Sequence, residues 1–590
     1  MKKITLLLSL ISIGVFAQNT VNLQHVATHH TGVFDDAAAE ILAYDPASKS
    51  IFYTNASDNE IGVLNVTDLS NITKSEIALP AGGVNSVDFY NGTIAVAFED
   101  TNKQADGKVL FYNLAGNLVN SVTVGALPDM VTFSPNGQMV LTANEGEPNS
   151  DYSVDPLGTV SIIDVSGGIS NLSQADVTTL DFSAYNANIN SLVRVNGNNG
   201  LSSVAQDLEP EYVAVSEDNK TAYVALQENN AIAVIDLTTK TITSVEGLGY
   251  KDWSTVGNQI DASDKSTEVT FANYNNLYGM YMPDAMKFFS VNGMDYLITA
   301  NEGDGREYDT FEDETKVSKI DLDSVAFPNY LELQEDTVLG RLVISATDGD
   351  TNNDGYFEKL FAFGGRSFSI WDANTRQLIY DSGDEIEKHV FAADPLNFNS
   401  TNDDNDSYKN RSDNKGPEPE AVEIAKIDGY TLAFIGLERQ GGIMTFDVSD
   451  PTNAKFLGYT NNRDFSEDAD KPEAGDLGPE DIIYIDANES PNGKPMLAVA
   501  NEVSGTVSFF EITSNFISIE ENNQNPIEMY PNPTSGILNL SETDMYTILD
   551  LNGNIIVKTK ETKTIDLSRL ASGVYLVQNS NGSYSKVIKQ

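Results

Sequence analysis

The chain has 590 residues with 87 acidic and 35 basic side chains, which gives a formal net charge of −52. A surface this acidic repels the phosphates of nucleic acids and anionic membranes, so neither is an expected partner, and it favours cations that prefer oxygen ligands, above all calcium. The absence of cysteine excludes disulfides and thiolate metal sites, and four histidines in the whole chain argue against a multi-histidine zinc site.

Residues 1–17 read as a signal peptide. Two lysines follow Met1, an apolar run extends from Ile4 to Phe16, and small residues precede a cleavage site after Ala17. The apolar run is too short to cross a membrane comfortably, and no later segment approaches about 18 consecutive apolar residues. We therefore expect an exported, soluble mature protein without an integral membrane span.

A strand–turn–strand unit, followed by a third strand that ends in an aspartate between apolar residues, recurs through most of the chain. Residues 131–143 give one clear copy, with Ser134-Pro135-Asn136-Gly137 as its turn. About eight such hairpins can be counted; they lie near 38–55, 84–99, 129–145, 211–228, 284–302, 342–372 (a degenerate copy), 420–438 and 480–502. Two tandem β-sandwiches would not explain one unit recurring this often.

The repeat predicts an all-β fold: a β-propeller over residues 18–513, followed by a small C-terminal β-sandwich. The number of blades, seven or eight, stays open, because a strand near 20–28 is available to complete the last blade. Nothing in the sequence calls for an obligate oligomer, so we expect a monomer.

Acidic residues recur at two fixed places in the hairpin. One acid, often next to proline, precedes the first strand, and an amide–acid or acid–arginine pair follows the second. Because an antiparallel hairpin returns to its starting end, both positions lie on one face, around the mouth of the central channel. The predicted metal ligands there are Glu209, Glu211, Asp284, Glu302, Glu418, Glu420, Glu480 and Glu502.

Carboxylates that converge in this way repel one another, and a bound hard cation or a nearby arginine would relieve the repulsion. Arg306, Arg366 and Arg439 are the candidate arginines, and they are also candidates to bind a phosphate or another ligand. The alternative is that these pairs are structural and satisfy backbone groups in the loops between strands.

A second candidate for calcium lies in one loop. Asp350, Asn352 and Asp354 alternate ahead of Gly355, like the first half of an EF-hand loop, and Asp348 or Glu358 would close the site. The twelfth position of a full motif is Phe361 rather than a bidentate acid. An Asx-rich turn is therefore the alternative.

No short catalytic motif is present. The sequence contains no GxSxG, no P-loop, no GxGxxG after a strand and no HExxH. Ser367 has only His389 as a conceivable partner, so we assign no nucleophile. We expect no organic cofactor, and no catalytic residue can be named.

The composition changes after Ile512. Residues 514–526 form a polar linker, and residues 527–590 carry a Pro-Asn-Pro turn at 531–533, short strands and a basic end. This module closely resembles the type A C-terminal sorting domain of the type IX secretion system. The resemblance implies export across the outer membrane of a Bacteroidetes-type cell, with the secretion machinery and its sortase as partners and a final place outside the cell or on its surface.

The propeller resembles the choice-of-anchor I family of secreted bacterial proteins over about residues 30–512. The matching segments are residues 205–212, 279–285, 299–304, 363–372, 416–420, 434–439, 475–480 and 501–506. Relatives are often labelled alkaline phosphatase-like or mesenchyme-specific cell-surface glycoprotein-like. The family supplies no agreed catalytic residues.

Two functions remain open from the sequence. The first is a surface propeller that binds calcium and an unknown extracellular ligand or polymer through its acidic channel face. The second is a calcium-dependent phosphomonoesterase, in which the ring carboxylates would hold metal ions and the arginines would bind phosphate oxygens. Only analogy at the level of the fold favours the enzyme.

Overall fold

The computed structural model describes residues 19–516, 527–550, 555–580 and 583–590. The predicted signal peptide, and the predicted linker from residue 517 to 526, lie outside these residues. The chain divides into two compact units, one spanning Asn19–Asn515 and one containing the C-terminal residues from Phe516 onward.

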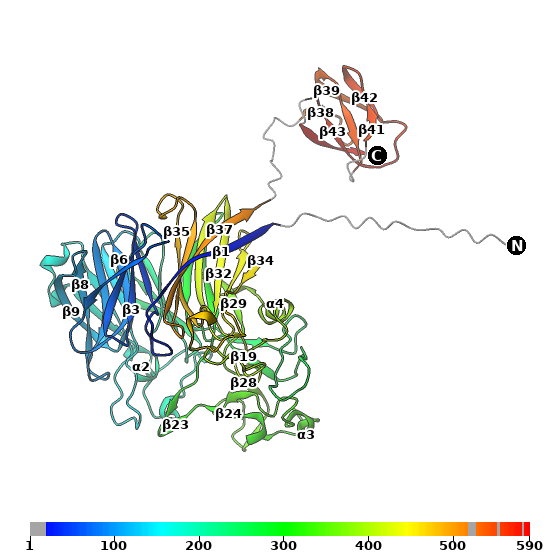
Figure 1. Ribbon diagram of the computed structural model, residues 1–590. Coiled ribbons are helices and arrows are strands. Elements are labelled where there is room, and N and C mark those ends of the chain that lie inside the picture. The colour runs from blue at the N-terminus through cyan, green and yellow to red at the C-terminus, as the bar shows by residue number, and fades with distance from the viewer. Residues whose placement is uncertain (1–18, 517–526, 551–554, 581–582) are drawn as a thin grey trace. The chain divides into compact units, whose positions relative to one another are not determined.

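The first unit is built from seven four-stranded antiparallel sheets, the blades of a propeller (Figure 1). Blade 1 contains β2 (Leu42–Asp45), β3 (Ser50–Asn55), β4 (Glu60–Asn65) and β5 (Thr73–Ala78); blade 2 contains β6 (Gly83–Tyr90), β7 (Thr93–Glu99), β8 (Asp106–Asn113) and β9 (Leu118–Ala126). Blade 3 contains β10 (Pro128–Phe133), β11 (Met139–Asn144), β12 (Thr159–Asp164) and β13 (Val177–Asp181); blade 4 contains β14 (Val213–Val215), β15 (Thr221–Leu226), β16 (Ala231–Asp236) and β17 (Thr241–Gly247).

Of the other three blades, blades 5 and 7 each combine strands that are not consecutive in the sequence. Blade 5 contains β20 (Met286–Val291), β21 (Met294–Asn301), β29 (Ser367–Asp372) and β30 (Leu378–Asp381); blade 6 contains β31 (Pro419–Ile427), β32 (Tyr430–Leu437), β33 (Ile443–Asp447) and β34 (Lys455–Thr460). Blade 7 contains β35 (Pro479–Ile485), β36 (Met496–Asn501), β37 (Thr506–Asn515) and β1 (Thr20–His30).

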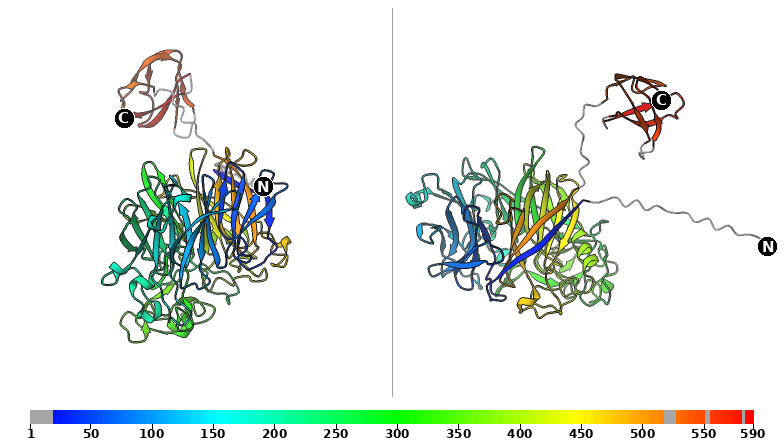
Figure 2. Two further views of the ribbon diagram at one scale, coloured as in Figure 1. Left: turned by 90° about the vertical axis from the view of Figure 1, so that its left-hand side faces the viewer. Right: turned by 45° about the horizontal axis from the view of Figure 1, so that its top comes forward.

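Pairing between the two ends of the unit closes the ring. Strand β1 runs antiparallel to β37, from Thr20 opposite Asn515 to His30 opposite Thr506. In Figure 1 and Figure 2 the dark-blue β1 lies beside the orange β37. The sequence left open whether a strand near 20–28 completes the last blade; β1 does so, and the number of blades is seven.

The hairpin predicted at 342–372 is wrong as a blade. The chain leaves blade 5 after Asn301 and returns to the same sheet at Ser367. Between these points β26 (Val343–Ser345) pairs with β24 (Glu314–Lys316), and β28 (Leu360–Ala362) runs parallel to β19 (Leu277–Met280). The apolar runs of this segment pack into a separate core within the insert, around Trp253, Phe327 and Leu342. Buried strands of an insert have the same apolar pattern as buried blade strands, which explains the wrong prediction.

The other short elements lie in the excursions between strands. They are α1 (Gly197–Gly200), α2 (Val204–Asp207), β18 (Tyr250–Asp252), β22 (Glu307–Tyr308), β23 (Phe311–Glu312), β25 (Asp321–Leu322), α3 (Tyr330–Leu333), β27 (Tyr356–Phe357) and α4 (Glu385–Ala393). No helix among the described residues is long and apolar enough to cross a membrane.

The core lies between neighbouring blades. The middle strands are buried on both faces, so they read as continuous apolar runs such as Ile94–Phe98 in β7, whereas the outer strand β5 is mostly exposed. Clusters of buried side chains join blade 1 to blade 2 and blade 7 to blade 1, among others. This packing fixes the first strand of every blade next to the channel.

The C-terminal unit is a small all-β module, as predicted. One sheet contains β38 (Met529–Tyr530), β39 (Ile537–Asp544) and β42 (Thr562–Asp566); the other contains β40 (Thr547–Leu549), β41 (Ile555–Lys558), β43 (Gly573–Gln578) and β44 (Tyr584–Lys589). Leu538, Ile548, Val577 and Val587 form the core of this module.

The closing strand should carry a measurable part of the propeller's stability. Leu23 in β1 is only 4% exposed, and truncating such a side chain costs about 2–5 kcal/mol. We therefore expect Leu23→Ala to lower the free energy of unfolding of the full chain by about that amount, as measured by urea denaturation. Gln24→Ala, at an exposed position of the same strand, should change it by less than about 0.5 kcal/mol. Equal losses of unfolding free energy in the two variants would contradict a stabilising role for the buried face of β1.

Candidate functional site

Strand pairing delivers the two acidic positions of each hairpin to one face of the propeller. Pro128 lies opposite Asn144, and Pro479 lies opposite Asn501, so the start of the first strand meets the end of the second. The register shifts at this point in blades 2, 3, 6 and 7. Such a bulge inserts one residue and redirects its side chain. Asp129, Glu420 and Glu480 occupy these bulges at the channel mouth.

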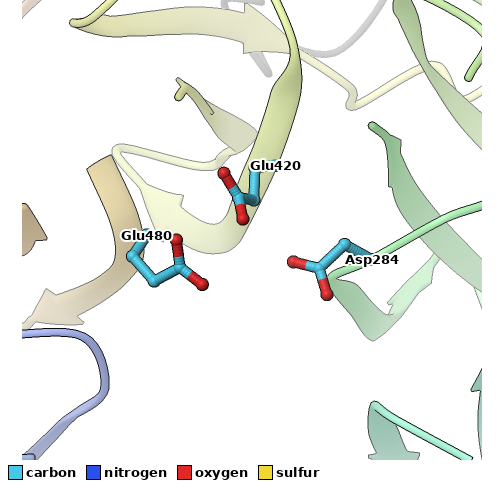
Figure 3. Close-up of side chains that lie close together, drawn as sticks. All are labelled: Asp284, Glu420 and Glu480. Atoms are coloured by element: carbon cyan, nitrogen blue, oxygen red, sulfur yellow. The ribbon is translucent and has the colours of Figure 1, made fainter. Parts of the chain in front are cut away.

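Three of the predicted ligands, from three blades, converge in the channel. Asp284, Glu420 and Glu480 each offer a carboxylate oxygen, and these oxygens lie within 4.8 Å of one another (Figure 3). We call this set the open trio. Glu420 is only 8% exposed, and its Oε2 atom has no hydrogen-bond partner among the described residues. Burial first, and then the neighbouring carboxylates, raise the pKa of all three groups well above its usual range.

A second trio on the same face contains its own cation. Oxygens of Glu302, Glu418 and Glu438 also lie within 4.8 Å of one another. The Lys415 ammonium lies 2.5 Å from Glu302 and 3.2 Å from Glu418, and Arg411 also binds Glu418. We call this set the lysine trio. Although burial raises the pKa of Glu418, Lys415 and the neighbouring arginines together lower it to about 2.

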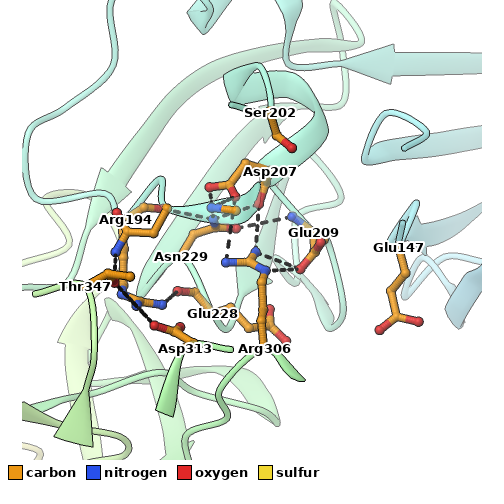
Figure 4. Close-up of polar contacts among 12 residues, drawn as sticks. Glu147, Arg194, Ser202, Asp207, Glu209, Glu228, Asn229, Arg306, Asp313 and Thr347 are labelled. Atoms are coloured by element: carbon orange, nitrogen blue, oxygen red, sulfur yellow. Dashed lines mark hydrogen bonds and ion pairs between the residues drawn. The ribbon is translucent and has the colours of Figure 1, made fainter. Parts of the chain in front are cut away.

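The remaining predicted ligands lie elsewhere in the ring. Glu209 accepts two hydrogen bonds from Arg306, at 2.9 and 2.7 Å, and Figure 4 shows this arginine between Asp207 and Glu209. Glu211 is 7% exposed, its Oε2 atom has no partner among the described residues, and burial together with Glu228 raises its pKa. Glu502 is not in either trio, and burial raises its pKa.

All three candidate arginines are engaged within the protein. Arg306 is held by Glu209 and by the carbonyl oxygen of Asp207. Arg366 is buried and donates to three carbonyl oxygens and to Glu387 at 3.0 Å. Arg439 is 29% exposed and pairs with the lysine trio through Glu418 and Glu438. None of them presents an unengaged guanidinium to a phosphate.

The structure brings together part of the predicted calcium loop. Carboxylate oxygens of Asp350, Asp354 and Glu358 lie within 4.8 Å of one another. Asn352 donates its side-chain amide to Glu358 at 2.6 Å, and Asp350 accepts backbone N–H groups of the loop itself. Asp348 instead pairs with Arg194 at 2.7 Å, outside this group.

A cavity of about 500 Å³ adjoins the open trio. We call it the mouth cavity. Its acidic and basic lining residues are Glu40, Glu99, Lys103, Asp129, Asp284, Glu480 and Asp481. Burial, Glu502 and Asp129 raise the pKa of Glu40 to about 8, and burial together with Glu147 raises that of Asp129 to about 7.

Sequence reasoning missed several of these groups. Glu40 and Glu99 occupy the same two hairpin positions in blades 1 and 2: Glu40 lies two residues before β2, and Glu99 is the last residue of β7. They lack the flanking proline and amide that marked these positions in the other blades. A search by position in the hairpin, without regard to the neighbouring residues, would have identified them. Lys415 lies in an irregular excursion between α4 and β31, where no periodic signal points to the channel.

Comparison with known families settles the resemblance drawn from the sequence. Residues 40–451 match the model of the choice-of-anchor I domain. The chain belongs to the choice-of-anchor I family. Residues 528–590 match a secretion system C-terminal sorting domain, which indicates secretion to the cell surface and makes the secretion machinery a partner.

Two curated relatives of this choice-of-anchor I protein come from animals. Gigasin-3a of Magallana gigas is 33% identical over 190 residues, which cover 30% of this chain and 66% of the relative. The mesenchyme-specific cell surface glycoprotein of Strongylocentrotus purpuratus is 28% identical over 234 residues, which cover 34% of this chain and 30% of the relative. The match therefore spans less than two thirds of either relative.

Two solved structures illustrate distant similarity to this chain. A Kuenenia stuttgartiensis hydrazine synthase has a TM-score of 0.41 at 11% identity, covering 82% of this chain and 97% of that one. A streptogramin B lyase has a TM-score of 0.41 at 9% identity, covering 84% and 98%. These values assign no activity to this chain.

The raised pKa values of Glu40 and Asp129 predict a pH dependence of stability. These carboxyls keep protons in the folded state that the unfolded chain releases near its ordinary pKa of about 4. Their contribution to the free energy of unfolding should therefore fall as the pH rises from about 4 to about 8. Urea denaturation of the full chain in EDTA should show a smaller fall in Glu40→Gln than in the parent. The exposed control Glu217→Gln should follow the parent, and a Glu40→Gln curve parallel to the parent's would contradict the assignment.

Lys415, the cation of the lysine trio, should contribute much more to the free energy of unfolding than a surface lysine does. Lys415→Met would leave Glu302 and Glu418 buried without their ammonium, and breaking a buried pair costs about 3–5 kcal/mol. Lys494→Met removes an ammonium that is 2.5 Å from Glu511 but 56% exposed, and should cost about 1 kcal/mol or less. Urea denaturation of both variants tests this, and similar losses would show that Lys415 does not neutralise the trio.

Proposed function

We propose that this choice-of-anchor I propeller binds a divalent cation, calcium, at the open trio and presents its channel mouth to a ligand outside the cell. The observation that carries the proposal is the contrast between the two trios. Both gather three carboxylates within 4.8 Å, but the lysine trio has the Lys415 ammonium in its midst, whereas Glu420 of the open trio keeps a buried oxygen without a partner. A cation at the open trio would play the part that Lys415 plays at the other.

The donor set favours calcium among the common cations. All three ligands are carboxylates, and hard oxygen donors select calcium or magnesium over softer metals. Calcium accepts six to eight oxygens in flexible geometry, which suits side chains from three separate blades, whereas magnesium demands a near-ideal octahedron. Each carboxylate can supply one or two oxygens, and water or a ligand in the mouth cavity would supply the rest.

The loop of Asp350, Asp354 and Glu358 remains a predicted second calcium site. Its carboxylates already accept hydrogen bonds from the loop's own amides and are exposed to water. Calcium binding there would have to compete with these bonds, so we expect it to be weaker than at the open trio.

Binding rather than phosphate hydrolysis is the function that the geometry supports better. The phosphomonoesterase alternative needs arginines that reach a phosphate near the metal, and Arg306 and Arg366 are both buried in contacts of their own. The acidic lining of the mouth cavity also repels a phosphate dianion. Attachment by a sortase after export stays part of the proposal, inferred from the sorting domain alone.

Calcium should stabilise the full chain through the open trio. At a calcium concentration of about 100 times Kd, the stabilisation is about 2.7 kcal/mol, which corresponds to a Tm rise of about 3 °C for a propeller of this size. Calorimetry with calcium and with EDTA should show this rise in the parent and its loss in Asp284→Asn and Glu420→Gln. The matched control Glu438→Gln, in the lysine trio, should retain it.

Two results would overturn or redirect this proposal. An unchanged Tm in calcium, or an equal rise in Asp284→Asn, would remove the open trio as the site. Calcium-dependent hydrolysis of p-nitrophenyl phosphate that disappears in Asp284→Asn would establish the phosphatase instead of the binding function.

A further inference from the structure

The mouth cavity is strongly unbalanced in charge. Six carboxylates line its 500 Å³, and Lys103 is the only basic side chain among its lining residues. Lys103 is 59% exposed and approaches Glu99 no closer than 3.7 Å. Most of the carboxyl groups of this cavity therefore have no cationic partner among its described lining residues.

A neighbouring cavity on the same face is nearly balanced and serves as an internal comparison. It encloses about 390 Å³ between Arg306 and Arg439. Five acidic side chains line it, together with four basic ones. An excess of negative charge is therefore a property of the mouth cavity rather than of the whole channel face.

The open trio forms one wall of the mouth cavity. Asp284 and Glu480 line the cavity, and Figure 3 shows Glu420 directed toward both of them. The buried, unpartnered Oε2 of Glu420 marks the place for an inorganic cation. On the other walls Glu40, Glu99 and Asp129 come from blades 1, 2 and 3, outside the trio.

The open trio and the wall formed by Glu40, Glu99 and Asp129 favour different chemical groups of one ligand. A cation at the trio takes oxygen donors, such as a pair of sugar hydroxyls, to complete its coordination. The carboxylates of Glu40, Glu99 and Asp129 attract positive charge and can accept hydrogen bonds from an ammonium. A phosphate is repelled, a neutral sugar leaves these carboxylates unpaired, and a polyamine brings no oxygen to the metal.

We propose that the mouth cavity binds an amino sugar with a free ammonium group, its hydroxyls on the cation of the open trio and its ammonium on Glu40, Glu99 and Asp129. This inference rests on the proposed calcium site and names the ligand of that face. The cavity is within the size range of pockets that hold small ligands, so it takes the end of an oligosaccharide rather than a long stretch of polymer.

Three matched probes test the proposal: the tetramers of glucosamine, N-acetylglucosamine and glucose. Titration calorimetry of the full chain in calcium, at about pH 7.5 and low salt, keeps Asp129 largely ionised, many of the amines charged and the charges unscreened. We expect the glucosamine tetramer to bind at least about tenfold more tightly than the other two, since it alone brings an ammonium that can form charge-assisted hydrogen bonds to the carboxylates.

Variants separate the two walls. Asp129→Asn and Glu40→Gln should each weaken glucosamine binding about tenfold while the calcium-induced rise in Tm remains. Asp284→Asn should abolish both. The exposed control Glu217→Gln should leave both unchanged.

Several outcomes would overturn the inference. Equal affinity for the three tetramers, or glucosamine binding indifferent to Asp129→Asn and Glu40→Gln, would remove the ammonium site. Spermidine binding in EDTA as tightly as the glucosamine tetramer binds in calcium would show a general amine site without a sugar. If calcium still raises the Tm of the parent in these cases, the proposed calcium site is retained and only the amino-sugar inference is rejected. If calcium does not raise the Tm of the parent, the proposed function itself is rejected.

Discussion

Pairing of β1 with β37 is the constraint on which the channel face depends. It holds blade 7 in a closed ring against blade 1, with a shared core of residues such as Ile51 and Ala498. Closure brings Glu480 of the last blade and Glu40 of the first to one cavity, although they are separated by most of the chain. Without the closing strand, the carboxylates of the channel mouth would have no fixed common centre.

Closure also creates an electrostatic problem that the protein answers in two ways. The strand bulges direct acids into a space where burial and neighbouring charges disfavour ionisation. At the lysine trio the chain supplies Lys415, Arg411 and Arg439, which lower the pKa of Glu418, although burial still raises the pKa values of Glu302 and Glu438. At the open trio the chain supplies no comparable cation among the described residues, and the pKa values of all three acids are raised.

Most of the fold could be predicted from the sequence because propeller blades repeat. The hairpin turns and the aspartate at the end of the third strand are local signals and were interpreted correctly, whereas the sequence left open whether a strand near 20–28 closes the ring. The insert between Asn301 and Ser367 was not interpreted correctly, since an apolar strand such as Leu360–Ala362 reads the same in a blade and in an insert. Antiparallel geometry also predicted the acidic face, but not which acids meet. That depends on single-residue bulges and on Lys415, which no repeat specifies.

The two trios differ in the source of the positive charge that would neutralise their carboxylates. An ammonium on a covalent side chain is present at any calcium concentration, so the lysine trio holds its shape from folding onward. A cation bound at the open trio would instead exchange with the medium, and its occupancy would follow the concentration outside the cell. The sorting domain indicates secretion of the protein to the cell surface, where it would meet that medium. With a cation bound at the open trio, one half of the channel mouth would keep a fixed charge from Lys415, and the charge of the other half would follow the cation concentration of its surroundings.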